Sequence, residues 1–352
     1  MKILTMAACA VVLATSVSAN TINLSTYFSS FVAIGDSLTD DGKFGGTPFE
    51  NGPPSLGGRF SNGITFAEHI AQDFSFSANL AIGGATARNQ NENSLLPAQF
   101  GTFGGQVETL GGIAANPRGR VALGNRPLFS VLMGSNDIIQ NIGLPDAGVP
   151  GPGNILPGIG ALAADAVAAN IRAIKSIDMQ FNDFLVMNLP DISLTPLFTN
   201  PVFGAGGLAP LAAQETAGFN TRLMQNVAAL RSEGINIIEF DLNAMFEELL
   251  ADAVANGINI TDPCTFDLSN LDPSLTCAFS PGAPGNTDIT LADNFFFVDG
   301  IHPNRVAQAA VADRFRDVAA NAVSPVPLPA GLPLLIAGLA GFGVLRMRRR
   351  AA

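Results

Sequence analysis

Residues 31–38 read FVAIGDSL, a short apolar run that ends in a glycine, an aspartate and a serine. Such a run is too short for a helix, and its polar boundary is typical of a buried strand. In an open α/β sheet, sites form at the carboxyl ends of the strands, because the backbone turns there and leaves side chains facing a crevice. Ser37 is therefore a candidate nucleophile at the end of a strand.

Similar apolar runs recur along the chain, with stretches of helical character between them. Further strands are expected at 128–133, 184–187 and 235–240, and helices at 64–73, 159–177, 211–233, 242–255 and 304–322. Strands that alternate with helices predict one α/β domain whose mostly parallel sheet is covered on both faces. Insertions rich in glycine and proline at 42–58, 143–160 and 201–210 are expected to shape the substrate surface.

A candidate base lies near the other end of the chain. His302 is one of two histidines, and it stands in the turn DGIHP at 299–303, three residues after Asp299. Nucleophilic serine catalysis needs a hydroxyl, a base within hydrogen-bond reach and a group that orients the base. Ser37, His302 and Asp299 would supply these three parts.

Two segments could donate hydrogen bonds to a developing oxyanion. Residues 79–85 read NLAIGGA, a predicted short strand ending in paired glycines, where the bare backbone N–H of Gly84 can approach a substrate oxygen. Residues 133–137 read MGSND, and the amide of Asn136 can donate as such side chains do in other hydrolases. Structural explanations stay open for both, since Asn136 could shape a turn and Gly84 could permit close packing.

Four blocks together resemble the GDSL, or SGNH, hydrolase family. They are GDSL at 35–38, the paired glycines ending at Gly84, GSND at 134–137 and DGIHP at 299–303, in the expected order. GRFSNG at 58–63 and NLPD at 188–191 look like segments of the secreted lipase-like branch of that family. The resemblance extends over residues 31–322.

This resemblance implies a flavodoxin-like, three-layer α/β/α fold with Ser37 as nucleophile, His302 as base and Asp299 as its orienter. The implied oxyanion hole consists of the backbone N–H groups of Ser37 and Gly84 and the side chain of Asn136. No cofactor is implied. The implied activity is that of a secreted serine ester hydrolase, a lipase or esterase that cleaves carboxylic esters through an acyl-enzyme, and its expected partner is an ester substrate.

Other functions fit the same residues. A phospholipase or acyltransferase would use the same acyl-enzyme with a lipid substrate or an alcohol acceptor, and an acetyl esterase would trim polysaccharide. A non-catalytic matrix or adhesion protein could retain the fold alone, since fold does not imply function.

The charge of the chain excludes some classes of binding partner. Five of the 18 basic residues lie in the two terminal segments described below, which contain no acidic residue. The remaining chain therefore has 13 basic and 29 acidic residues, a net charge of −16. Such a surface repels nucleic acid and anionic lipid headgroups.

Cys264 and Cys277 are expected to form a disulfide in an oxidising compartment. No metal is expected, because a metal site would need more soft ligands than the chain offers.

Both ends of the chain carry targeting patterns. Residues 1–19 combine Lys2, an apolar stretch and small residues up to Ala19, which is typical of a secretory signal peptide. The other end reads VPLPA at 326–330, then an uncharged stretch to residue 345, then four arginines. That stretch is short for a bilayer core needing about 20 residues, and the arginines mark a cytoplasmic flank, so a plain tail anchor stays open.

The C-terminal pattern resembles the VPLPA variant of the PEP-CTERM sorting signals, which exosortase-type enzymes cleave in Gram-negative bacteria. The expected segments are a signal peptide at 1–19, a hydrolase domain at 20–325 and a sorting signal at 326–352 made of motif, transmembrane helix and Arg-rich tail. Signal peptidase and an exosortase-type enzyme are then expected partners. The protein would be exported, anchored transiently in the inner membrane, and finally found at the cell surface or outside the cell.

We expect the mature protein to lack both ends, beginning near Asn20 and ending near the VPLPA motif. The intact mass of the protein recovered from its native host measures this. A C-terminus that still reaches Ala352 would rule out the sorting signal in favour of a tail anchor, and would leave the predicted esterase activity untouched.

Overall fold

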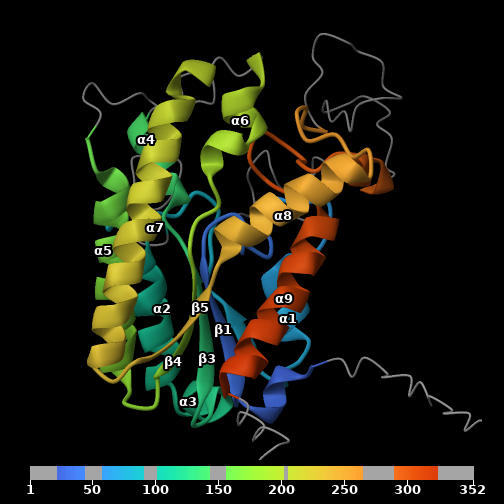
Figure 1. The fold of residues 1–352 in the computed structure, drawn as a ribbon. Coiled ribbons are helices and arrows are strands. Elements are labelled where there is room, and N and C mark those ends of the chain that lie inside the picture. The colour runs from blue at the N-terminus through green and yellow to red at the C-terminus, as the bar shows by residue number, and fades with distance from the viewer. Residues whose placement is uncertain are drawn as a thin grey trace, which may run out of the picture.

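A five-stranded parallel sheet forms the middle layer of the part of the chain that the structure describes (Figure 1). This structure, a computed structural model, describes residues 22–43, 58–90, 101–142, 156–201, 205–264 and 289–323. The strands are β1 (Ser30–Gly35), β2 (Ser77–Asn79), β3 (Pro127–Leu132), β4 (Asp183–Met187) and β5 (Asn236–Phe240). Their order β2-β1-β3-β4-β5 is that of flavodoxin-like sheets. The predicted α/β fold is confirmed.

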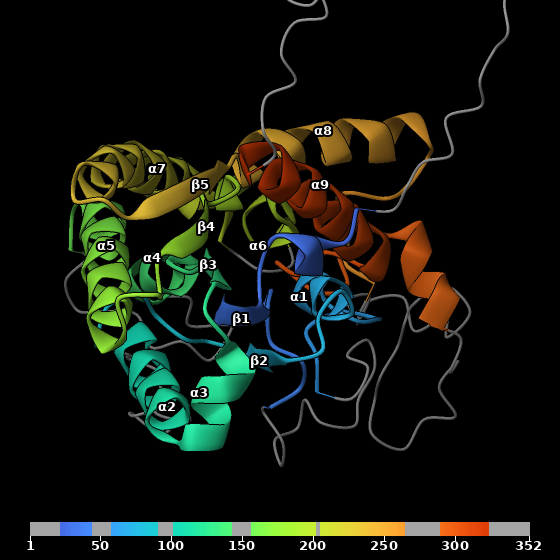
Figure 2. The same ribbon diagram turned by 90° about the horizontal axis from the view of Figure 1, so that it is seen from below.

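Helices cover both faces of this sheet, as the view along the strands shows (Figure 2). One face carries α1 (Phe66–Ala71) and α9 (Arg305–Val323), with α8 (Leu242–Ala255) beside α9, and the other carries α2 (Phe103–Ala115), α5 (Ile159–Ile177) and α7 (Ala209–Ser232). Shorter helices complete the described elements: α3 (Pro117–Leu123), α4 (Ser135–Ile142), α6 (Pro196–Thr199), and the 3-10 turns η1 (Leu24–Thr26), η3 (Ile192–Leu194), η5 (Gly206–Leu208) and η6 (Ile289–Asn294).

The burial of the strands explains why the apolar runs predicted them. Every position of the central strands β1 and β3 is buried, because a parallel sheet with helices on both faces hides both sides of its inner strands. The edge strand β5 instead exposes Asn236 and Glu239. The four strands predicted from apolar runs, and the five predicted helices, coincide with observed elements to within a few residues.

One local expectation was wrong, and one of the long helices was not predicted. The segment 79–85 is not a strand, because β2 ends at Asn79. The backbone beyond still follows β1, with the N–H of Leu80 donating to the carbonyl of Ala33 at 2.8 Å, before the paired glycines turn the chain away. The helix α2 was missed because its sequence, FGGQVETLGGIAA, is rich in glycine, which costs a helix about 1 kcal/mol per residue relative to alanine. Burial of Phe103 and Leu110 against the domain holds it in place.

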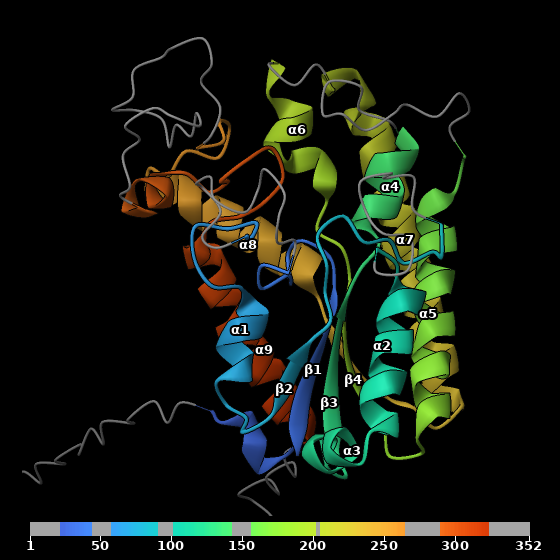
Figure 3. The same cartoon turned by 180° about the vertical axis from the view of Figure 1, so that it is seen from behind.

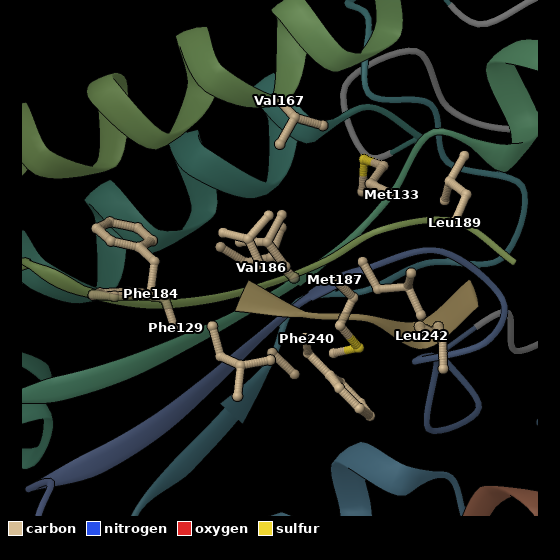
Figure 4. Packing of buried hydrophobic residues seen from close by; sticks show 14 of the residues in the cluster. Phe129, Met133, Val167, Phe184, Val186, Met187, Leu189, Phe240 and Leu242 are labelled. Atoms are coloured by element: carbon tan, nitrogen blue, oxygen red, sulfur yellow. The ribbon is translucent and has the colours of Figure 1, made fainter. Parts of the chain in front are cut away.

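Phenylalanine supplies ten of the twelve largest fully buried side chains in the described part of the chain, which has no tryptophan. On one face of the sheet, Phe129 stacks on Phe184 with ring centroids 5.0 Å apart (Figure 4). On the other face, the ring of Phe315 on α9 meets Phe31 of β1 edge-on at 6.0 Å and Phe66 of α1 at 6.2 Å. The helix α9 is thereby fixed directly to the first strand.

Several predicted features lie outside the described residues. These are the signal peptide at 1–19, the sorting signal at 326–352, Cys277 and most of the glycine- and proline-rich insertions at 42–58 and 143–160. Of the insertion at 201–210, the described residues include η5 and the start of α7. Cys264 is buried, and its pairing with Cys277 stays a prediction. Within the described ranges, no helix has both the length and the apolar character required to cross a bilayer.

Replacing Phe315 by alanine should test how strongly α9 is held. The ring is fully buried, and removing such a side chain typically costs about 3–5 kcal/mol of unfolding free energy. Urea unfolding measures the loss. Val121→Ala, at a position that is 81% exposed, is the control and should change stability by less than about 0.5 kcal/mol. A loss below about 1 kcal/mol for Phe315→Ala would contradict this packing role.

Candidate active site

The nucleophile candidate Ser37 stands at the carboxyl end of β1, in a tight turn. The carbonyl of Asp36 accepts the backbone N–H groups of Thr39 and Asp40 at 3.0 Å each, which folds the chain back directly after the strand. A side chain at Gly35 would meet Thr39 Oγ1 at 2.5 Å, so only glycine allows the turn to close. The side chain of Ser37 is buried, with 6% of its surface exposed. It follows β1 at the carboxyl end of the sheet, the end at which β3 and β4 lead into α4 and α6 (Figure 3).

A buried glutamine fixes the strand end that carries this turn. Gln106 of α2 accepts the backbone N–H of Gly35 at 3.0 Å and donates its amide to the carbonyl of Gly35 at 2.8 Å. The side chain therefore bonds both backbone polar groups of the last residue of β1, and the carbonyl of Gly35 also accepts the N–H of Ile82 at 3.3 Å. Sequence reasoning missed Gln106, because nothing local marks a glutamine in a glycine-rich segment as a partner for a strand 71 residues away.

The structure brings the three predicted residues together. Nε2 of His302 lies 2.6 Å from Oγ of Ser37, and Nδ1 of His302 lies 2.6 Å from Oδ2 of Asp299. The other carboxylate oxygen of Asp299 accepts the backbone N–H groups of Ile301 at 2.9 Å and His302 at 2.8 Å. With Nδ1 donating to the carboxylate, Nε2 is the acceptor that faces the serine hydroxyl.

Asp299 remains ionised despite its setting. Burial alone would raise its pKa, but the charge of His302, the hydrogen bond from the ring and the two backbone N–H groups outweigh burial and hold the pKa below its ordinary value of 3.8. A carboxylate in this state favours an imidazolium as neighbour. That is the property required of a group that supports a general base.

The two predicted oxyanion residues meet at one turn. Asn136, at the start of α4, donates its side-chain amide to the carbonyl of Ala85 at 2.9 Å, and Gln140 donates to the carbonyl of Gly84 at 3.2 Å. Gly84 has a φ of 77°, which favours glycine. An amide group carries two hydrogens, so Asn136 keeps one donor beyond the bond to Ala85. Asn136 lines the same pocket as Ser37 and His302, whereas Gly84 is not among the residues that line it.

Two aspartates hold this turn from opposite sides. Asp40, after β1, accepts the N–H of Gly83 at 2.8 Å. Asp137 of α4 accepts the N–H groups of Ala87 at 2.7 Å and Arg88 at 3.1 Å. Burial raises the pKa of Asp137 to about 7, although both N–H bonds and the charge of Arg88 oppose the rise. The turn that carries Gly84 is therefore fixed to both neighbouring elements.

The segment 58–63 braces the turn that carries His302. The ring of Phe60 packs against the imidazole of His302 with centroids 5.0 Å apart, and the hydroxyl of Ser61 donates to the carbonyl of Pro303 at 3.2 Å. Asn62 accepts the N–H of Arg305 at 2.7 Å, where α9 begins. The sequence marked this segment by its resemblance alone, without a role for its side chains.

An apolar pocket opens beside Ser37. Its empty volume is about 800 Å³, including the part open to solvent. It lies between the end of the sheet and the helices α8 and α9, and its apolar lining includes Leu132, Phe246, Leu249, Phe296, Ile301 and Val311. Within the described part of the chain, no group of three or more His, Cys, Asp or Glu side chains is placed to hold a metal ion.

Residues 31–315 match the sequence model of the family described as GDSL-like Lipase/Acylhydrolase. The chain is 27% identical over 299 residues to the thermolabile hemolysin of Vibrio parahaemolyticus, a match covering 82% of the chain and 63% of the hemolysin. It is 25% identical to a GDSL esterase/lipase of Arabidopsis thaliana, covering 80% of the chain and 79% of that protein. Esterase EstA of Pseudomonas aeruginosa is 26% identical, covering 81% of the chain but 46% of EstA. The chain thus spans only part of the length of the hemolysin and of EstA.

Asp137 should make stability depend on pH in a direction opposite to that of an ordinary aspartate. Its pKa is about 7 in the folded chain against an ordinary 3.8, so its contribution to stability is complete below about pH 4 and is lost as the pH rises through about 7. The melting temperature of the wild type minus that of Asp137→Asn should therefore shrink between pH 4 and pH 8.

The control for this experiment is Asp317→Asn, on the exposed face of α9. A difference between wild type and Asp137→Asn that stays constant over the same pH range would show that the carboxyl group does not titrate there.

Proposed function

Because the chain belongs to the GDSL-like lipase/acylhydrolase family, we propose that it is a serine ester hydrolase that cleaves carboxylic esters through an acyl-enzyme on Ser37. The observation that carries this proposal is the line of two 2.6 Å contacts from Ser37 through His302 to Asp299, beside an apolar pocket. Names of the relatives, which include an esterase and an esterase/lipase, agree with ester chemistry.

In the first half of the proposed reaction, Oγ of Ser37 attacks the carbonyl carbon of the ester while Nε2 of His302 takes the hydroxyl proton. The carbonyl oxygen becomes an oxyanion. The tetrahedral intermediate collapses when His302 passes its proton to the departing alkoxide, which leaves as an alcohol. Asp299 stabilises the imidazolium that exists between these two proton transfers.

In the second half, His302 takes a proton from water, and the resulting hydroxide attacks the acyl carbon on Ser37. Collapse of this intermediate returns the proton to Ser37 Oγ and releases the carboxylic acid. We assign the oxyanion to the backbone N–H groups of Ser37 and Gly84 and to the amide of Asn136. The support for Asn136 is its place in the pocket lining and its remaining donor hydrogen.

The apolar pocket supports an acyl group with an alkyl chain as substrate. Leu242, Phe246 and Leu249 line the pocket from one face of α8, over a length of roughly 10 Å at 1.5 Å per residue. Each methylene moved from water into such a site contributes about 0.8 kcal/mol. This favours a lipase or esterase of medium-chain esters over an acetyl esterase of polysaccharide, for which most of the pocket would have no use.

Export and cell-surface location are part of the proposal as well. They rest on the sequence patterns at 1–19 and 326–352 alone.

A phospholipase or acyltransferase would share the acyl-enzyme and differ in the alcohol that leaves or accepts the acyl group. Analysis of the products formed with added glycerol distinguishes hydrolysis, which yields free fatty acid, from transfer, which yields a new ester.

Ser37→Ala should abolish turnover of p-nitrophenyl esters, lowering kcat by several powers of ten as loss of a catalytic triad member does. The fold should persist, because the substitution removes only a hydroxyl group, which contacts His302, and leaves the apolar packing unchanged. Ser232→Ala, at the exposed end of α7, is the matched control and should retain wild-type rates. Turnover by Ser37→Ala within tenfold of the wild type, at equal melting temperature, would contradict the assignment of Ser37 as the nucleophile.

A series of p-nitrophenyl esters of increasing acyl length tests whether the pocket binds the acyl chain. Between acetate and octanoate, kcat/KM of the wild type should rise by up to about fourfold per methylene, the equivalent of 0.8 kcal/mol. A preference for acetate over octanoate would instead favour the acetyl esterase.

A further inference from the structure

The ring of Phe60 lies between two parts of the site that sequence reasoning treated separately. On one side it packs against the imidazole of His302, with centroids 5.0 Å apart and planes tilted by 41°. On the other side it rests on the backbone of Gly83. A Cβ atom built at Gly83 would lie 2.2 Å from Cε2 and 2.4 Å from Cζ of Phe60.

The paired glycines therefore serve two different purposes. Gly84 has a positive φ of 77°, whereas Gly83 is not among the glycines with positive φ. At Gly83 an L-residue is acceptable to the backbone, and it is the ring of Phe60 that excludes a side chain. Gly83 is also tied to the turn after the nucleophile, because its N–H donates to Asp40 at 2.8 Å.

The segment around Phe60 is itself fixed on both sides. Arg59 donates two hydrogen bonds to Glu68 of α1, at 2.7 and 2.6 Å. Ser61 bonds the carbonyl of Pro303, and Asn62 bonds the N–H of Arg305. The ring is thus presented to His302 by a backbone that bridges α1 and the start of α9, rather than by a loose side chain.

His302 needs such support. The two polar contacts of its ring, to Ser37 at Nε2 and to Asp299 at Nδ1, leave the ring able to rock about the line that joins these two atoms. A packed neighbour on the ring opposes that motion. Small displacements matter here, since misplacing a catalytic group by about 1 Å can cost on the order of 10²-fold in rate.

We propose that Phe60 is a positioning residue that couples the general base to the oxyanion turn, by packing on His302 and on Gly83 at the same time. It holds Nε2 of His302 in line with Ser37 Oγ, and it fixes the backbone that leads into Gly84. This inference rests on the proposed ester hydrolysis at Ser37. It adds a residue with no polar group to the machinery of that reaction.

A double-mutant cycle of Gly83→Ala and Phe60→Ala tests the coupling. Gly83→Ala places a methyl group where the ring lies and should displace it, lowering kcat on p-nitrophenyl butanoate by about 10- to 100-fold with KM changed less than about threefold. Phe60→Ala should lower kcat similarly. The double variant should be no slower than Phe60→Ala alone, because the new methyl then occupies space that the ring has vacated.

Controls separate this effect from general damage. Gly111→Ala in α2, where an added Cβ meets nothing within 4 Å, should keep wild-type kcat. Phe74→Leu, a partly buried phenylalanine that stacks on Phe31 at 5.9 Å away from the site, should lower the melting temperature without lowering kcat. If Phe60→Ala does not fold, Phe60→Leu takes its place in the cycle.

A second readout is the rate at which a fluorophosphonate labels Ser37, which needs the base and the oxyanion donors but no natural substrate. It should fall in parallel with kcat in the two single variants. Losses in the double variant that equal the product of the single losses, or Gly83→Ala with wild-type kcat, would overturn the role of Phe60 while leaving the esterase in place. Absence of both labelling and ester turnover in the wild type would overturn the proposed function, and this inference with it.

Discussion

The 2.6 Å contact between Ser37 Oγ and His302 Nε2 joins two turns that lie 265 residues apart in the sequence, and the arrangement of the rest of the domain maintains it. One turn ends β1 and the other begins α9. The same strand and helix meet again through Phe31 and Phe315, so the packing that stabilises the domain also sets the distance between nucleophile and base. Gln106 holds the last residue of β1 from the opposite face of the sheet. Stability and site geometry therefore depend on the same contacts.

The site also concentrates buried acidic groups with distinct tasks. Asp299 is held ionised by His302 and by backbone N–H groups. Asp137 and Asp36 have pKa values raised by burial, to about 7 and about 6 respectively, and Asp137 and Asp40 use their oxygens to anchor backbone. Environments that push the pKa values of neighbouring carboxyl groups apart give chemically identical side chains different functions. Here one supports the base, and others fix the turns around it.

Sequence reasoning located four of the five strands and picked out three residues that the structure brings together, because both have local signals in the sequence. A buried parallel strand is a continuous apolar run, and Ser37, Asp299 and His302 stand in short turns next to such runs or helices. Contacts between distant segments leave no local signal. Gln106 sits in a glycine-rich helix that propensity argues against, and Phe60 could be recognised only once Gly83 and His302 were placed around it. The paired glycines were noticed, but the different physical reason for each required the backbone angles and the neighbouring ring.

In the proposed reaction, Ser37 carries the acyl group during turnover. The most direct measurement is to mix the protein with p-nitrophenyl butanoate, quench in acid during turnover, and map the peptides by mass. We expect a butanoyl adduct on the peptide that contains Ser37, located at that serine, and no adduct in Ser37→Ala. Steady ester turnover with no adduct on Ser37, or with the adduct on another residue, would contradict it.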